Sequence, residues 1–308
     1  MERWTEDDIA PLGGRTFMVT GANSGLGFET ARALAGHGAR VLMTARDRAK
    51  GAVAADRIRS ADPDADVELV ILDLADLDSV RSVAADLDGP LDVLVNNAGV
   101  MMPPRSLSPQ GHELQFATNH LGHFALTGLL MDRLVASDEA GRDARVVTVS
   151  STMHRPGRIH YDDLTGERGY SPTGWYSQSK FANVLFGLEL DRRLRAAGSG
   201  IRSVLAHPGY AATNLQSTGP SGLSKVLMSV GNRLMAQSAA AGARSELYAA
   251  TDPDVRGGQF IGPDGLGQNR GHPKVVRPVG RAEDRGDARR LWELSEELTG
   301  VRFDLPAA

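Results

Sequence analysis

Thr16-Phe17-Met18-Val19-Thr20-Gly21-Ala22-Asn23-Ser24-Gly25-Leu26-Gly27 is the stretch that decides the fold of this chain. Its first five residues predict a buried strand, and an amphipathic helical pattern follows over 25–37. The glycines between them predict a tight turn that lets backbone N–H groups approach a pyrophosphate. An ordinary strand-to-helix turn is the alternative, but this placement favours a dinucleotide site formed by Gly21, Asn23, Ser24, Gly25, Leu26 and Gly27.

Short apolar runs alternate with longer amphipathic stretches along the rest of the chain. Strands are predicted at 16–20, 40–44, 67–72, 91–95, 145–150, 202–206 and 259–261, and helices at 25–37, 47–60, 76–87, 109–136, 173–197, 238–250 and 284–299. This alternation predicts one α/β domain over residues 1–308, a doubly wound, seven-stranded parallel sheet with helices on both faces. Residues 214–237 mix glycine and proline with leucine and methionine, and we predict that they form a substrate-side flap.

The composition excludes several classes of protein. The 308 residues carry a net charge of −4 from interspersed acids and bases, without the basic block of a nucleic-acid-binding protein. The absence of cysteine excludes disulfides, thiolate metal sites and cysteine nucleophiles. No histidine spacing is typical of a metal site, and no Gly-x-Ser-x-Gly elbow indicates a hydrolase. A polar, acidic N-terminus and the lack of a long apolar stretch predict a cytoplasmic protein without a membrane anchor.

The residues after the second and third predicted strands bear on the nucleotide. Arg46 follows the second strand, about 20 residues after the glycines, where an acid would indicate NAD and a base the 2′-phosphate of NADP. We therefore predict a preference for NADP(H) over NAD(H), although Asp47 could partly neutralise Arg46 and a solvated arginine is the alternative. Asp73, with Leu74 beside it, is placed to accept a hydrogen bond from the adenine amino group; a cap for the helix near Asp76 is the alternative.

Tyr176 and Lys180 lie four residues apart in a predicted helix, so both side chains project from one face. A free phenol keeps its proton until about pH 10, but a nearby ammonium group favours the phenolate and lowers the pKa of the phenol. Such a group suits proton exchange with an alcohol or carbonyl oxygen. Two side chains that only cover the surface of a helix are the alternative.

Four ordered motifs resemble those of the short-chain dehydrogenase/reductase family. They are the glycine pattern, Asn96-Asn97-Ala98-Gly99 after the fourth strand, the Tyr-x-x-x-Lys pair, and Pro208-Gly209 after the sixth strand. The resemblance covers nearly the whole chain and implies a single-domain Rossmann fold. Within the family, Gly21-Ala22-Asn23-Ser24-Gly25, Asn119-His120-Leu121-Gly122-His123-Phe124 and the long interval from Ser151 to Tyr176 are most similar to the retinol dehydrogenase and protochlorophyllide reductase branch.

The resemblance implies a catalytic tetrad of Asn119, Ser151, Tyr176 and Lys180. Tyr176 would exchange a proton with the substrate oxygen as hydride moves to or from nicotinamide C4, and Lys180 would lower its pKa and hold the ribose hydroxyls. Ser151 would stabilise the charge on the substrate oxygen, with Ser150 as the rival. Asn119 would anchor a water that leads protons from Lys180 to solvent; capping of a local kink is the alternative. Further cofactor contacts are implied for Asn97, Ala98, Gly99, Pro208, Gly209 and Thr213.

These expectations together describe an NADP(H)-dependent oxidoreductase that interconverts a carbonyl and an alcohol. The flap and neighbouring loops are rich in Leu, Met and aromatic residues, so a fairly large apolar substrate is expected. Reduction of an activated C=C bond and a non-catalytic NADP(H)-sensing protein are the alternatives. The resemblance also implies a homodimer or homotetramer through the helices at 109–136 and 173–197, with a monomer as the alternative.

Overall fold

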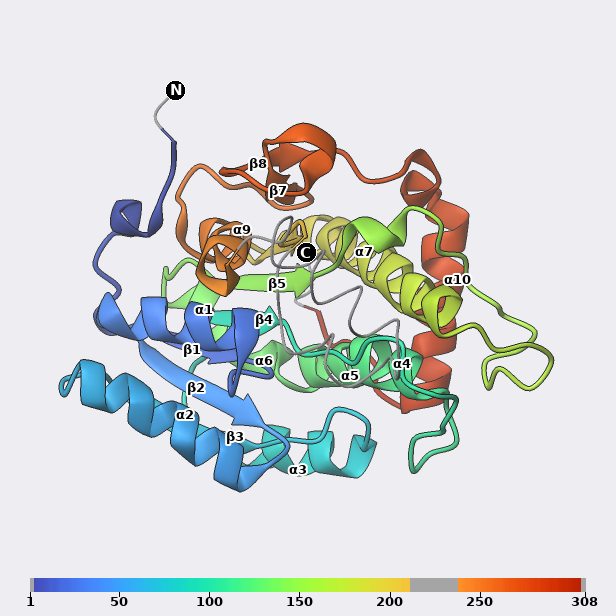
Figure 1. The fold of residues 1–308 in the computed structure, drawn as a ribbon, viewed down its shortest axis with the longest axis horizontal. Coiled ribbons are helices and arrows are strands. Elements are labelled where there is room, and N and C mark those ends of the chain that lie inside the picture. Colours follow the sequence, from blue (N-terminus) through green and yellow to red (C-terminus); the bar gives the residue numbers. More distant parts are fainter. Residues whose placement is uncertain (1–2, 211–237, 306–308) are drawn as a thin grey trace, which may run out of the picture.

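A mostly parallel sheet forms the centre of the molecule (Figure 1). The structure is a computed structural model that describes residues 3–210 and 238–305. Within those residues the strands run in the order β3-β2-β1-β4-β5-β6-β7-β8. Their bounds are β1 (Thr16–Val19), β2 (Arg40–Ala45), β3 (Val67–Ile71), β4 (Val93–Asn96), β5 (Arg145–Val149), β6 (Arg202–Ala206), β7 (Phe260–Pro263) and β8 (Pro273–Val276). The order reverses between β1 and β4, and the carboxyl ends of all the parallel strands face one edge.

The predicted doubly wound parallel sheet is confirmed, but it has eight strands and not the seven predicted. An eighth strand, β8, pairs antiparallel with β7 at the end of the sheet. Its four residues include an N-terminal proline and the exposed Lys274 and Val275, so no buried apolar run marks it in the sequence. Short, partly charged edge strands are typical of natural sheets, because they resist pairing with another chain.

Helices cover both faces of the sheet, and strand alternation divides the core between them. Phe17 and Val19 of β1 pack towards one face, whereas Met18 packs towards the other. The first face is covered by α1 (Gly25–Gly36), α2 (Arg48–Ala61) and α9 (Ala239–Thr251). The second is covered by α3 (Leu77–Asp86), α5 (Gly122–Leu129), α6 (Met131–Glu139), α7 (Pro172–Ala196) and α10 (Arg285–Thr299). Burial on both sides explains why three consecutive residues of β1 and of β4 are apolar, Phe17 to Val19 and Val93 to Val95.

The helix predicted over 109–136 is broken in the structure. It begins with the short α4 (Leu114–Phe116), continues as a π-helical turn over Ala117–Leu121, and then forms α5. A second break at Leu130 separates α5 from α6. At Gly122 the chain passes so close to the loop after β3 that a Cβ atom would lie 2.2 Å from the Leu74 carbonyl oxygen. This close approach is a tertiary contact, which helical periodicity in the sequence does not reveal.

Candidate active site

The glycine turn after β1 forms an open helix N-terminus. Gly21 has a φ of +67°, and a Cβ atom on Gly27 would lie 2.4 Å from Asn97 Nδ2 and 2.6 Å from the Gly21 oxygen. Only glycine fits either position. Ser24 occupies the N-cap of α1, but its side chain makes no capping hydrogen bond. Among residues 3–210 and 238–305, the first N–H groups of α1 have no side-chain acceptor, and an anionic phosphate suits them.

A second turn, at the end of β4, is bonded directly to the glycine turn. The Thr20 hydroxyl oxygen accepts hydrogen bonds from the backbone N–H groups of Asn97 and Ala98, both at 2.9 Å. Asn97 Nδ2 donates in return to the Thr20 carbonyl oxygen at 2.6 Å. Thr20, predicted only as a strand residue, thus holds the two loops of the expected dinucleotide site together. The contacts span 77 and 78 positions, so no local pattern indicates them.

Arg46 lies exposed directly after β2, at the carboxyl edge of the sheet. Asp47 does not neutralise it, because that carboxylate caps α2 by accepting from Lys50 N at 3.1 Å and pairs with Lys50 Nζ at 3.5 Å. Among residues 3–210 and 238–305, no ion pair holds the Arg46 guanidinium. Asp73 accepts from Ala75 N, while Asp76 itself caps α3. The alternative role of Asp73 as the cap of that helix is therefore wrong.

Helix α7 brings Tyr176 and Lys180 into a buried position. The helix begins with Ser171 as N-cap and Pro172 in the first turn, one residue before the predicted start. Tyr176 is 7 % exposed and Lys180 is 5 % exposed. Lys180 Nζ lies 5.9 Å from the centre of the Tyr176 ring and donates to the Val149 carbonyl oxygen at 3.1 Å. These two side chains therefore do not merely cover the surface of a helix.

Burial dominates the protonation of both groups. It raises the pKa of Tyr176 to about 12, and a hydrogen bond with Ser151 acts in the opposite direction. This pKa shift is opposite to the one expected from the Tyr-Lys spacing, which leaves out the cost of placing a phenolate in the protein interior. Burial also lowers the pKa of Lys180 to about 8, against the negative charge of the buried Glu246. At neutral pH the Tyr176 phenol is therefore protonated and can donate a proton.

The two serines after β5 have different surroundings. Ser150 Oγ donates to the Lys180 carbonyl oxygen at 2.8 Å and is buried. Ser151 is half-buried and hydrogen-bonds to Tyr176, so it is the serine that faces the phenol. Its carbonyl oxygen accepts from His154 Nδ1 at 2.6 Å, and His154 Nε2 accepts from Val279 N at 3.2 Å. His154, which gave no signal in the sequence, thereby ties the Ser151 loop to the segment after β8.

Asn119 lies in the π-helical turn and is fully buried. Its side chain accepts from Val100 N at 2.8 Å and donates to Val100 O at 3.0 Å and to Ser179 Oγ at 2.9 Å. It thus joins the loop after β4 to α7. A Cβ atom on Gly99 would lie 3.0 Å from Asn119 Oδ1 and 3.8 Å from Lys180 Nζ, which places these three residues side by side. The helix is indeed distorted at Asn119, but the side chain bonds across to other elements and does not cap its own helix.

The structure describes only part of the segment after β6 that was predicted to contact the cofactor, which contains Pro208, Gly209 and Thr213. Gly209 has a φ of +71°, and a Cβ atom there would lie 2.4 Å from the Asn269 oxygen. The loop with Pro208 and Gly209 is held beneath the β7–β8 connection, where Tyr210 N donates to Asn269 O at 2.7 Å. Thr213 and the predicted flap at 214–237 lie outside the described residues.

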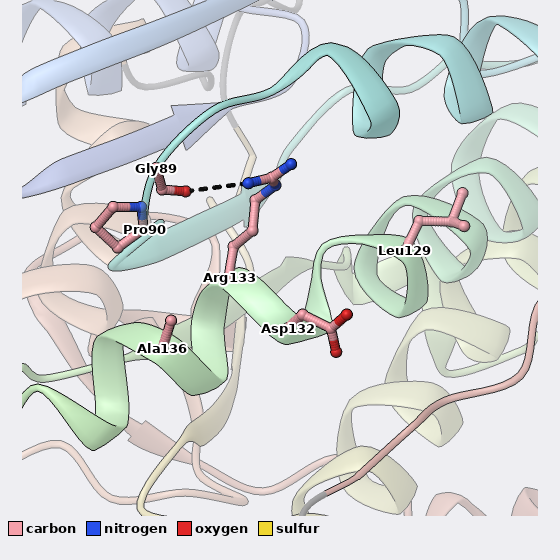
Figure 2. A pocket seen from close by; sticks show the side chains of 6 residues that line it. All are labelled: Gly89, Pro90, Leu129, Asp132, Arg133 and Ala136. Carbon is pink, nitrogen blue, oxygen red and sulfur yellow. Dashed lines mark hydrogen bonds between the residues drawn. The ribbon is translucent and has the colours of Figure 1, made fainter.

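A separate hollow of about 460 Å³ is lined by Gly89, Pro90, Leu129, Asp132, Arg133 and Ala136 (Figure 2). Gly89 and Pro90 precede β4, so this hollow lies at the amino end of that strand, away from Tyr176 and the glycine turn. Among residues 3–210 and 238–305, no group of His, Asp or Glu side chains could hold a metal ion. In the same residues, no helix has the length and apolar character to cross a bilayer.

Comparisons with known proteins agree with this geometry. A sequence model of the family described as short chain dehydrogenase matches residues 15–222. Retinol dehydrogenase 14 of Mus musculus is 39 % identical over 96 % of this chain and 88 % of its own length, and polyprenol dehydrogenase of the same species is 38 % identical over 95 % and 86 %. A solved structure of an uncharacterised protein from Mycobacterium paratuberculosis superposes with a TM-score of 0.82 at 45 % identity, covering 99 % of this chain and all of the other. The chain belongs to the short-chain dehydrogenase/reductase family of oxidoreductases and within it resembles the retinol dehydrogenases.

Proposed function

We propose that this protein is an NADP(H)-dependent oxidoreductase that interconverts an alcohol and a carbonyl on a fairly large apolar substrate. One observation carries the proposal: Ser151, Tyr176, Lys180 and Asn119 are gathered at the carboxyl edge of the sheet, beside an uncapped glycine turn. In open α/β sheets ligands bind at this edge, where the strand order reverses. The buried phenol and the hydrogen-bonding serine match the needs of proton transfer to an oxygen atom.

Each side chain has a distinct part in the proposed reaction. When bound, the nicotinamide cofactor supplies or accepts the hydride. In the direction of reduction, Tyr176 donates its phenolic proton to the carbonyl oxygen, and in oxidation it takes the proton of the alcohol. Ser151 donates a hydrogen bond to the same oxygen and stabilises the charge that develops on it. Lys180 provides a positive charge near the phenolate and holds the ribose hydroxyls, and Asn119 positions the loop after β4 against α7.

The proposed apolar substrate is supported by the names of the two relatives and by the loop after β4. Retinol and polyprenol are both long, apolar alcohols. Met101 and Met102 follow the Asn-Asn-Ala-Gly turn, and both are only partly buried. Met102 has a φ of +54°, unusual for a residue with a side chain, and Gln115 Oε1 holds it there by accepting from Met102 N at 2.8 Å. A methionine whose backbone is held in place, and whose thioether side chain is flexible, suits an apolar ligand.

The NADP(H) preference rests on Arg46, and its removal tests that preference. We expect Arg46→Ala to weaken NADPH binding by about tenfold or more, because a charge-assisted hydrogen bond to the 2′-phosphate is lost. NADH, which lacks that phosphate, is expected to bind as before. Titration of both cofactors by fluorescence gives the two dissociation constants. Arg48→Ala, an exposed arginine two residues away, is the control and should change neither; equal weakening of NADPH and NADH by Arg46→Ala would contradict the assignment.

Ser151 distinguishes carbonyl reduction from the reduction of an activated C=C bond. If the reacting group is a carbonyl, Ser151→Ala removes a donor aimed at the developing oxyanion and is expected to lower kcat by about 10²–10³-fold. A C=C substrate needs that donor less, so its rate should fall only a few-fold. NADPH oxidation with a panel of large apolar ketones, aldehydes and enones measures this. Ser150→Ala, which removes only the bond to the Lys180 carbonyl, serves as the neighbouring control.

A further inference from the structure

One buried side chain, His123 of α5, joins the glycine turn to the π-helical turn. It is 1 % exposed. His123 Nε2 lies 2.9 Å from Thr20 Oγ1, and His123 Nδ1 lies 3.0 Å from the Asn119 carbonyl oxygen. These contacts reach the two segments that hold the proposed cofactor and the proposed catalytic groups. No step of the proposed reaction uses His123.

The partners of the ring determine which nitrogen carries the proton. Thr20 Oγ1 already accepts two hydrogen bonds, from the N–H groups of Asn97 and Ala98, so it has no lone pair left for a further donor. Its hydroxyl hydrogen has two acceptors in reach, the Val95 carbonyl oxygen at 3.2 Å and His123 Nε2 at the shorter distance of 2.9 Å. The shorter contact favours donation to Nε2. The Asn119 carbonyl can only accept, so Nδ1 carries the hydrogen. Burial, with the positive charge of Lys180 acting in the same direction, lowers the pKa of His123 to about 4 and keeps the ring neutral.

The bond to Asn119 lies within the distorted part of the helix. His123 follows Asn119 by four residues, so its ring reaches a carbonyl one helical turn back, within the π-helical turn. The other side of His123 is fixed as well, because its own carbonyl oxygen accepts from Thr127 Oγ1 at 2.7 Å and Asn96 Nδ2 donates to that hydroxyl at 3.0 Å. The two ring contacts and the bond at its own carbonyl hold His123 between the glycine turn and the π-helical turn.

We propose that His123 is a positioning residue that couples the cofactor-binding turn to the catalytic helix through the path Thr20–His123–Asn119–Ser179. Thr20 at one end holds the Asn97 and Ala98 backbone beside the glycine turn. Asn119 at the other end holds Ser179, whose hydroxyl donates to the Tyr176 carbonyl oxygen at 2.8 Å. The inferred effect of His123 on catalysis rests on the proposed function, whereas its inferred effect on cofactor binding does not.

Two substitutions separate the two ends of the ring. In His123→Asn the amide nitrogen can replace Nδ1 and keep the bond to Asn119, but it cannot reach Thr20. In His123→Gln the amide oxygen can replace Nε2 and keep the bond from Thr20, but the contact with Asn119 is lost. We expect His123→Asn to weaken NADPH binding by about threefold to tenfold with kcat nearly unchanged, and His123→Gln to lower kcat by about tenfold with the dissociation constant nearly unchanged.

Binding is measured by NADPH titration without substrate, and hydrogen exchange at the Val100 amide, which donates to Asn119 Oδ1, reports on Asn119 without any turnover. If the wild-type enzyme turns over no substrate, the proposed function fails while these two readouts still decide the inference. His120→Asn and His120→Gln are matched controls, because His120 is equally buried but bonds to Ser295 on α10. Both His120 variants should lower the melting temperature. They should not change NADPH affinity in one variant and Val100 amide exchange in the other.

Two results would overturn the proposal. One is a pair of His123 variants that change affinity, kcat and Val100 exchange in the same proportion, or that lower only the melting temperature; His123 would then be a packing residue. The other concerns the unsubstituted protein and remains decisive if both variants fail to fold. Nitrogen-15 chemical shifts of the imidazole should show a protonated Nδ1 and a bare Nε2, and a protonated Nε2 contradicts the path.

Discussion

Tyr176→Phe is expected to lower kcat by about 10²–10⁴-fold while NADPH affinity stays within about twofold of the wild type. Phenylalanine keeps the ring that packs in this 7 % exposed position and removes only the hydroxyl that faces Ser151. Because burial raises the pKa of Tyr176 to about 12, the wild-type phenol is protonated at neutral pH and is ready to donate to a carbonyl oxygen. Loss of one hydrogen bond should cost only about 1 kcal/mol of stability.

Steady-state rates with NADPH and a panel of apolar ketones, together with a binding titration, measure this prediction. Tyr161→Phe is the control, since the Tyr161 hydroxyl bonds to Asp287 Oδ1 on α10, away from the glycine turn. Turnover that survives Tyr176→Phe would rule out the proposed mechanism. A wild-type protein that binds NADPH tightly but reduces or oxidises none of the panel would favour the non-catalytic alternative.

Lys180→Met should abolish most activity and yet stabilise the fold. Lys180 is 5 % exposed, and the pKa of its ammonium group falls from 10.5 to about 8 because the interior disfavours the charged form. A difference of this size corresponds to about 3 kcal/mol of lost stability at neutral pH. Methionine fills similar space without a charge, and the Val149 carbonyl keeps a donor in Asn183 Nδ2 at 3.1 Å. We therefore expect a higher free energy of unfolding together with a loss of kcat of about a hundredfold or more.

The pH dependence gives the sign of this effect. A lysine whose folded-state pKa is lowered destabilises the fold fully below that pKa, and the cost disappears as pH rises from about 8 towards 10.5. The stability advantage of Lys180→Met should thus be largest at pH 7 and shrink by pH 10. Urea unfolding at both values tests it, with Lys50→Met, an exposed lysine, as the control. If Lys180→Met is less stable than the wild type at pH 7, the interactions of the Lys180 ammonium group outweigh the cost of burying its charge.

The sequence predicts the parallel part of the fold well because each element carries its own local signal. Short, mostly apolar runs mark β1, β4 and β5, and the glycine turn marks the start of α1. Where the local signal is weak or misleading, the prediction is wrong. Exposed Lys274 and Val275 conceal β8. Apolar periodicity also runs through Asn119 and Leu130 without showing the π-helical turn or the break between α5 and α6.

The proposed site likewise contains residues that the sequence indicates and residues that it does not. Tyr176, Lys180, Ser151 and Asn119 lie in motifs whose order along the chain indicates them, and the structure brings them together. The side chains that hold them were not predicted. Thr20 contacts His123 across 103 positions, and His154 contacts Val279 across 125. Such pairs leave no spacing pattern, since only the folded sheet brings their elements to one edge.

The amino-acid sequence by itself determined the layered α/β architecture, the glycine turn and the identities of the groups proposed to act on substrate and cofactor, because these depend on residue type and short spacings. Only the tertiary structure decided their chemical state. The Tyr-Lys spacing predicts a lowered phenol pKa, but burial between packed helices raises it, since the free energy of a charge depends on all the atoms around it. Tertiary packing likewise placed His123 between the glycine turn and Asn119.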